Sequence, residues 1–209
     1  MYVPPPISST LARFVAVAFC LGAATSGVSA DVVIEWNTTM TEYVRPLSPV
    51  VVAPFVETRA YAMAHIAMFD AIDEAKGLRP HRGPADFNAA AAQAAHDVLV
   101  HEFPAGTATF NGVLAGNLAA IPNSAAKTKG IAIGADAAAA ILAARANDGS
   151  ATPPSPYVPG TAPGDYQPTP PFDGPPFNGF VDATNWGKVT PFVLKKGNQF
   201  RAPPPYKVT

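Results

Sequence analysis

The sequence has 209 residues, of which 48% are hydrophobic and 10% aromatic. This apolar content is enough for one or two domains with a buried core, and it excludes a fully disordered chain. Fourteen Lys and Arg residues against fifteen Asp and Glu residues give a formal net charge of −1, without the basic excess that binding to nucleic acid or to an anionic membrane requires. Charged residues make up only 14% of the chain, beside 24 prolines and 16 glycines. That balance favours a large, loop-rich protein over a small soluble domain.

The first thirty residues have the pattern of a secretory signal peptide. Arg13 precedes an apolar run over residues 14–24, and small residues follow up to Ala30, after which cleavage is predicted. The run is well short of the roughly 20 residues that span a bilayer, so an uncleaved membrane anchor is the less favoured alternative. The only cysteine, Cys20, lies inside this segment, which leaves the mature chain without a disulfide or a thiolate site. We expect a secreted or periplasmic protein with no stable membrane anchor after cleavage.

Residues 31–150 are predicted to form an Ala-rich helical domain. Pro54 suits the first turn of a helix, and residues 57–75 are apolar on nearly every face, which indicates a buried helix. Asn88 is expected to cap a helix over 89–103 that Pro104 ends, a third helix covers 107–121, and Ser124 is expected to cap a fourth over 125–146. About four helices with short connections predict an antiparallel bundle, so the expected fold class is all-α.

Residues 151–209 differ in texture and are predicted to form a proline-rich, extended C-terminal arm. Fourteen of the 24 prolines fall here, and proline interrupts both helices and strand ladders. Aromatic residues are interleaved throughout the arm, whereas a disordered linker is usually poor in them. We therefore expect the arm to lie over a folded surface with its rings as anchors. A proline-rich ligand of a signalling domain is the alternative, and an exported chain disfavours it.

Several polar residues are candidates for a functional site. His65 and Asp70 lie in the most apolar helix, but five positions place them about 140° apart around its axis, so a structural role is expected for both. His96 and His101 are also five apart rather than at the i and i+4 spacing of a zinc-binding helix. Asp97 and His101 are expected to form an ordinary i, i+4 surface pair.

A basic cluster and two glycine pairs remain. The cluster Arg79-Pro80-His81-Arg82 could hold an oxyanion such as phosphate, but an exposed turn between helices explains it without a ligand. It is the one basic cluster that we single out from the sequence. The pairs Gly112/Gly116 and Gly130/Gly134 are expected to let helices approach closely. Phosphate-binding Gly-Lys loops, Gly-x-Ser-x-Gly elbows and cysteine nucleophiles do not occur in the mature sequence.

Several segments, taken together and in order, resemble a known family. They are Val33-Ile34-Glu35-Trp36-Asn37, residues 64–71 (AHIAMFDA), residues 94–99 (AAHDVL) before Phe103-Pro104, residues 130–134 (GIAIG), residues 143–149 (AARANDG), residues 186–192 (WGKVTPF) and residues 199–205 (QFRAPPP). This order is similar to the N-terminal half of exported bacterial proteins related to vanadium-dependent haloperoxidases, in the type 2 phosphatidic acid phosphatase superfamily. The resemblance covers nearly all of residues 33–206.

The resemblance implies an all-helical fold and a vanadate or phosphate pocket built by the C-terminal half of the complete protein. The family's Pro-Ser-Gly-His element does not occur in this sequence, so no catalytic, cofactor-binding or metal-ligating residue is carried over to it. His65 and Asp70 match positions of the family's N-terminal helix, for which support of the bundle is implied. Vanadate is implied only for a complete relative, which would oxidise halides with peroxide or hydrolyse phosphate esters.

The expected function is that of a truncated, inactive N-terminal portion of such an enzyme. Its expected partner is the missing C-terminal half, a separate polypeptide or a second copy of the chain, and no nucleic acid. The alternative is a non-catalytic helical module that packs on a partner polypeptide. A small metalloprotein that uses the four histidines is ranked last.

Overall fold

The computed structural model describes residues 31–48, 52–77 and 85–203. These residues form five α-helices, two short 3-10 turns and no β-strand. The helices are α1 (Val32–Val44), α2 (Pro54–Ala75), α3 (Phe87–Glu102), α4 (Thr107–Ala120) and α5 (Ala125–Arg145), and the turns are η2 (Pro104–Gly106) and η3 (Trp186–Lys188). The predicted all-α class is confirmed, with one helix more than the four expected. None of the helices in these ranges has the length and apolar character needed to cross a membrane. The signal peptide predicted for residues 1–30 lies outside the described residues.

Helix α1 is the element that the sequence reading missed. The side chain of Asp31 caps it by accepting a hydrogen bond from the amide of Val33 at 2.8 Å, which satisfies one of the free donors of the first turn. Its buried residues recur every four positions and form one stripe; they are Val32, Trp36, Met40 and Val44. Valine, isoleucine and threonine supply much of the rest of the helix, and these β-branched residues weaken the helical signal in the sequence.

Helix α2 begins at Pro54 and ends at Ala75, as the sequence predicts. Its buried face is made of small or flexible side chains; they are Ala60, Met63, Ala64, Ala67, Met68, Ala71 and Ala75. The opposite side of the helix faces outward, and Phe69 is 66% exposed. The expectation that α2 is buried all round is therefore wrong: the alanines let its neighbours approach one face, and a bulky residue is left on another.

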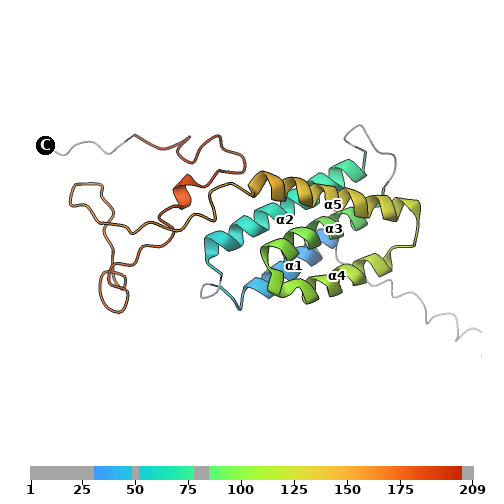
Figure 1. The fold of residues 1–209 in the computed structure, drawn as a ribbon, viewed down its shortest axis with the longest axis horizontal. Coiled ribbons are helices and arrows are strands. Elements are labelled where there is room, and N and C mark those ends of the chain that lie inside the picture. Colours follow the sequence, from blue (N-terminus) through green and yellow to red (C-terminus); the bar gives the residue numbers. More distant parts are fainter. Residues whose placement is uncertain (1–30, 49–51, 78–84, 204–209) are drawn as a thin grey trace, which may run out of the picture.

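Helix α3 lies at the centre of the bundle and packs against each of the other four helices (Figure 1). It begins one residue before the predicted cap, because Asp86, rather than Asn88, accepts the capping hydrogen bond from Ala89 N at 2.8 Å. Its buried residues are mostly alanines; they are Ala89, Ala90, Ala91, Ala92, Ala94, Ala95, Val98 and Leu99. Methyl groups on several faces of the helix are what allow four neighbours to approach it.

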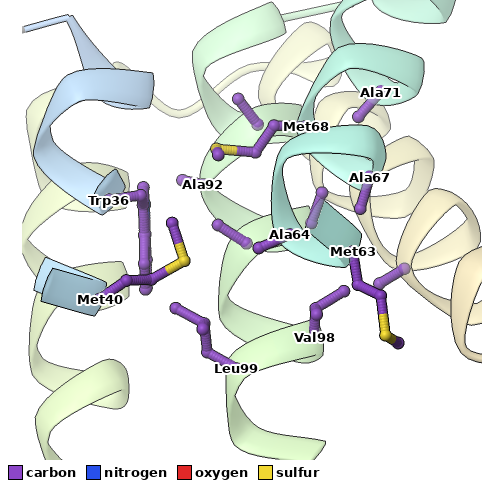
Figure 2. Packing of buried hydrophobic residues seen from close by; sticks show 14 of the residues in the cluster. Trp36, Met40, Met63, Ala64, Ala67, Met68, Ala71, Ala92, Val98 and Leu99 are labelled. Atoms are coloured by element: carbon purple, nitrogen blue, oxygen red, sulfur yellow. The ribbon is translucent and has the colours of Figure 1, made fainter. Parts of the chain in front are cut away.

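The larger core side chains come mainly from the helices around α3. Figure 2 shows Trp36 and Met40 of α1 facing α3, with Met68 of α2 on the adjoining side. All three are 0–1% exposed. The indole Nε1 of Trp36 donates to Asn117 Oδ1 of α4 at 2.9 Å, so the one polar atom of this ring is satisfied.

Glycine sets the distance between α3 and α5. A Cβ atom on Gly134 would clash with the carbonyl of Ala90 and lie 2.8 Å from Gln93 Cβ, and one on Gly130 would clash with the carbonyl of Asp86. Close approach at this pair is confirmed. It is wrong for Gly112 and Gly116 of α4, where an added Cβ would meet nothing within 4 Å. Ser124 caps α5 as predicted, by accepting from Lys127 N.

The arm, residues 151–203 as far as described, projects from one end of the bundle as turns and extended segments (Figure 1). Two aromatic pairs form within the arm itself, Tyr157 with Tyr166 at a ring-centroid distance of 5.7 Å and Phe172 with Phe177 at 4.9 Å. Four rings between residues 166 and 180 are exposed; they are Tyr166, Phe172, Phe177 and Phe180. The expectation that the rings of the arm anchor it on a folded surface therefore fails for these four rings, whereas Trp186 and Phe192 do contact the bundle.

Candidate functional site

Four charged side chains, which we call the arginine cluster, meet where the arm joins the bundle. Its members are Arg59 of α2, Glu102 at the end of α3, Arg145 at the end of α5, and Asp148 just beyond α5. Arg59 Nη1 donates to Glu102 Oε2 and Arg59 Nε to Asp148 Oδ2, both at 2.8 Å. Arg145 Nη2 lies 2.9 Å from the same Asp148 oxygen. One carboxylate oxygen therefore joins two guanidinium groups from different helices.

The position of each member follows from local helix chemistry. A cation at a helix C-terminus is favourable because the last carbonyls carry partial negative charge, and Arg145 occupies that place in α5. Arg59 Nη2 donates to the carbonyl of Arg145 at 3.2 Å, one of the acceptors that a helix end leaves without an intrahelical partner. Glu102 stands at an unfavourable end of its own helix, and Arg59 compensates for this. Gly149 has a φ of +92°, which lets the chain turn away directly after Asp148.

The same cluster fixes the arm to the bundle. The carbonyl of Asp148 accepts from Thr190 N at 2.8 Å, while Arg145 donates to the carbonyls of Thr190 at 2.5 Å and Pro191 at 3.3 Å. The ring of Phe192 lies over the guanidinium of Arg145 at 4.1 Å, within the range of cation–π attraction. Hydrogen bonds, charge and ring contacts therefore all converge at residues 190–192.

A second contact between arm and bundle is aromatic. Trp186 packs on Phe55 of α2 with ring centroids 4.6 Å apart. Between this pair and the arginine cluster lies an open hollow of about 470 Å³, whose walls include Phe55, Trp186, Phe192 and Arg145. A surface that combines aromatic walls with a few polar groups is typical of a binding site.

The electrostatics of the cluster are balanced. Burial raises the pKa of Asp148, but the hydrogen bonds from Ser150 and Arg59 and the charge of Arg59 outweigh it, so that the pKa falls to about 2. Two cations then face two carboxylates, and most guanidinium donors are used within the cluster or on the arm. The exception is Arg145 Nε, which is buried and has no hydrogen-bond partner within the described residues.

This donor set does not fit vanadate or phosphate. A tetrahedral oxyanion needs several convergent donors that are not already neutralised, whereas Arg59 and Arg145 direct theirs to carboxylates and carbonyls. The arrangement holds three helices and the arm in a fixed relative position.

The residues singled out from the sequence lie elsewhere. His65 Nδ1 donates to the carbonyl of Tyr61, one turn back in α2, at 2.8 Å. Asp70, further along the same helix, is half-buried. Arg59, in the same helix, is bound to Glu102 and Asp148. The structural role expected for His65 is consistent with this hydrogen bond, although its partner is in the same helix rather than in a neighbouring one.

His96 and His101 contact different partners. His96 Nδ1 is 2.7 Å from Asp97 Oδ1, and its Nε2 is 2.7 Å from Asn111 Oδ1. The hydrogen bond to Asp97 is the main reason that the pKa of His96 is raised, with burial acting in the opposite direction. His101 Nδ1 lies 3.2 Å from Glu102, so the expected pair between Asp97 and His101 is not what the structure shows. Within the described residues no group of three or more His, Cys, Asp and Glu side chains is placed to hold a metal ion.

Two groups of basic residues remain, one predicted from the sequence and one seen only in the structure. The cluster at residues 79–82 lies outside the described residues. The sequence does not predict the arginine cluster, because Glu102 lies 43 positions and Asp148 lies 89 positions after Arg59 in the chain. No local pattern joins residues so far apart. The signal that could have found part of it is the run Arg145-Ala146-Asn147-Asp148-Gly149, in which a cation, a carboxylate and a glycine follow directly on a predicted helix.

Comparisons with protein-family models, with curated proteins and with solved structures found no significant match to this chain.

Proposed function

We propose that this chain is the helical, non-catalytic N-terminal portion of an exported protein of the vanadium-dependent haloperoxidase and type 2 phosphatidic acid phosphatase kind. A second portion, joined to it or separately encoded, would supply the oxyanion pocket. The complete protein would oxidise halides with peroxide or hydrolyse phosphate esters. The ordered sequence motifs support the family. The exposed rings of the arm and the contacts of the arginine cluster support a non-catalytic role for this portion.

The observation that carries the division of labour is the uncovered aromatic surface of the arm. Four rings between residues 166 and 180 are exposed, although the root of the arm is held firmly by the arginine cluster. Phe172 and Phe177 pack on each other and are both exposed, and a cluster of exposed apolar side chains indicates an interaction site in a soluble protein. A second polypeptide unit packed on the arm would cover it.

The contacts of the two arginines support the non-catalytic half of the proposal. Arg59 and Arg145 are bound to Glu102, Asp148 and main-chain carbonyls. Freeing Arg59 for a ligand would weaken the pairing of both carboxylates, and freeing Arg145 would release its bonds to the arm. The cluster is therefore assigned to holding the arm, and the chemistry to residues outside this chain.

The first test is an activity assay on the purified chain. With vanadate, bromide and hydrogen peroxide, bromination of a phenol dye should not exceed a protein-free control, and an aryl phosphate should not be hydrolysed. Robust turnover in either assay would overturn the non-catalytic assignment.

The second test concerns the partner. Co-expression with a polypeptide that carries a Pro-Ser-Gly-His element should give a complex that elutes as one species and gains vanadate-dependent activity. The nucleotide sequence that follows the codon for Thr209 is an independent check, since a frame encoding that element supports the proposal.

The exposed rings also suit a second candidate, a helical binding module with no catalytic partner. Under that reading the chain is a cooperatively folded monomer, and co-expression with the Pro-Ser-Gly-His polypeptide yields no complex. Light scattering and denaturant unfolding of the purified chain distinguish the two.

A further inference from the structure

Charge is strongly segregated along this nearly neutral chain. Residues 1–182 contain nine basic and all fifteen acidic residues, a formal charge of −6. Residues 183–209 contain five basic and no acidic residues, a formal charge of +5. The overall charge of −1 therefore hides a basic C-terminal segment.

Four of these cations gather around one hollow in the arm. Lys188, Lys195, Lys196 and Arg201 all line an open space of about 490 Å³. All four are exposed, and none forms a salt bridge with a carboxylate in the described part of the chain. The segment is folded back tightly here, since a Cβ on Gly197 would lie 3.3 Å from the carbonyl of Gly187.

Apolar side chains protrude beside these cations. We call residues 192–201 the basic loop; in it Phe192, Val193 and Leu194 directly precede the two lysines, and Phe200 directly precedes Arg201. Val193 is 91% exposed and Phe200 80% exposed. Phe192 and Leu194 line the hollow beside Trp186, whereas Val193 and Phe200 line neither hollow and extend into solvent. Clustered exposed apolar side chains usually mark an interaction site in a soluble protein.

We propose that the basic loop is a reversible docking surface for an anionic lipid bilayer. Protruding apolar side chains enter the boundary between head groups and acyl chains, while the surrounding cations remain at the level of the anionic head groups. Residues 31–150, which include the bundle, contain eight basic and twelve acidic residues, a formal charge of −4. This charge favours the orientation in which the loop faces the membrane and the bundle faces away. Because residues 190–192 are bound to Arg145 and Asp148, the loop begins directly at a fixed point of the fold.

The side chains favour a bilayer over other polyanions. Nucleic acids are bound through aromatic rings on which bases stack. Phe200 could serve in that way, but Val193 and Leu194 are aliphatic and would stay in water, whereas a bilayer takes up both kinds of side chain. An acidic polypeptide would be held by the cations alone and would leave the protruding apolar groups in water. This surface is independent of the exposed rings at 166–180 on which the proposed function rests.

The test is binding of the full chain to vesicles, followed by co-sedimentation. Vesicles of phosphatidylcholine with about 30 mol% phosphatidylglycerol should bind the chain, and pure phosphatidylcholine vesicles should bind it much more weakly. Each cation near an anionic surface is expected to raise the partition coefficient about fivefold, so Lys195→Gln/Lys196→Gln should lower it about 25-fold. Raising the salt concentration from about 0.1 M to about 0.5 M should weaken binding strongly.

Two further variants separate insertion from simple charge attraction. Val193→Ser/Phe200→Ser should weaken vesicle binding while leaving the charge unchanged. Arg45→Gln/Lys76→Gln removes two exposed cations from the bundle and should leave vesicle binding unchanged. Circular dichroism checks that each variant is folded.

Three results would overturn the proposal. The first is equal binding to vesicles with and without phosphatidylglycerol. The second is that Val193→Ser/Phe200→Ser binds vesicles as well as the parent does, or that soluble polyglutamate or DNA at equal charge concentration abolishes binding to vesicles. Either result would show that the loop binds polyanions in general. The third is that Arg45→Gln/Lys76→Gln loses as much vesicle binding as Lys195→Gln/Lys196→Gln does. The attraction would then come from the charge of the whole molecule rather than from the loop.

Discussion

The helical bundle and the arm are ordered by different means. In the bundle, small residues bring helices close together over long faces, and α3 contacts every other helix. In the arm, a few polar and aromatic contacts at residues 186–192 join a segment that is otherwise mostly exposed. The bundle is therefore stabilised by many weak contacts, whereas the attachment of residues 186–192 to the bundle depends on a few groups. Substitutions should affect the two regions in correspondingly different ways.

The largest effect is expected where the bundle depends on close approach. In Gly134→Leu the new side chain would meet the carbonyl of Ala90 and the Cβ of Gln93, so α5 must move away from α3. Overpacking against backbone should lower the free energy of unfolding by more than about 4 kcal/mol, enough to prevent stable folding. Denaturant unfolding measures this.

The matched control is Gly116→Ala in α4, where an added Cβ meets nothing within 4 Å. Because alanine favours the helix over glycine by about 1 kcal/mol, this variant should be as stable as the parent or slightly more so. Equal effects of the two substitutions would show that α3 and α5 do not approach as closely as described.

The next largest effect is expected at the arginine cluster. Asp148→Asn keeps the size of the side chain but leaves Arg59 and Arg145 without their shared carboxylate, which should cost about 3 kcal/mol of unfolding free energy. The emission of Trp186 should change as the arm loses its attachment. Asp165→Asn, at an exposed carboxylate within the arm, is the control and should change stability by less than about 0.5 kcal/mol. Similar losses in the two variants would contradict a special role for Asp148.

The pH dependence of stability tests the same carboxylate. The pKa of Asp148 is about 2 in the folded chain against a usual value of 3.8, so the folded state favours the ionised form. Its contribution, about 2 kcal/mol, is fully present above about pH 4 and is lost as the pH falls toward 2. Unfolding midpoints between about pH 2 and pH 5 should fall less steeply in Asp148→Asn than in the parent. Parallel slopes would show that Asp148 does not titrate abnormally.

The smallest effect is expected for the ring contact between arm and bundle. Phe55→Leu removes the aromatic partner of Trp186 and should cost about 1 kcal/mol, with a red shift of Trp186 emission. The second tryptophan, Trp36, is fully buried and provides a constant background. Phe172→Leu, whose partner Phe177 lies within the arm, should leave the emission unchanged.

The parts of the fold that sequence predicts well have local chemical causes. Pro54 begins α2 and Ser124 caps α5 because each acts within its own first turn. For α3 the sequence predicts Asn88 as the cap, whereas in the structure Asp86 accepts the capping hydrogen bond. Helix α1 was missed because it is rich in the β-branched residues valine, isoleucine and threonine, which weaken the helical signal in its sequence.

The candidate site could not be predicted in the same way. Arg59, Glu102 and Asp148 come together only once three helices and the start of the arm have packed, and nothing in a helical period encodes that meeting. The overall composition argued against binding to an anionic membrane, because a net charge of −1 does not show that the charges are segregated on either side of residue 182. Helix α2 shows a third limit, because an all-apolar pattern does not say which face its neighbours will cover.

The hydrogen bond from Thr190 N to the carbonyl of Asp148 closes an excursion of the chain at its base. Closing a loop of about 40 residues costs on the order of 3 kcal/mol of chain entropy, and doubling its length adds only about 0.6 kcal/mol. The excursion between these two residues can therefore lengthen, shorten or accept an inserted domain with little effect on the closure. Asp148 and Thr190, which close the excursion, must stay in place. New loops could therefore be grafted onto the bundle between these two residues.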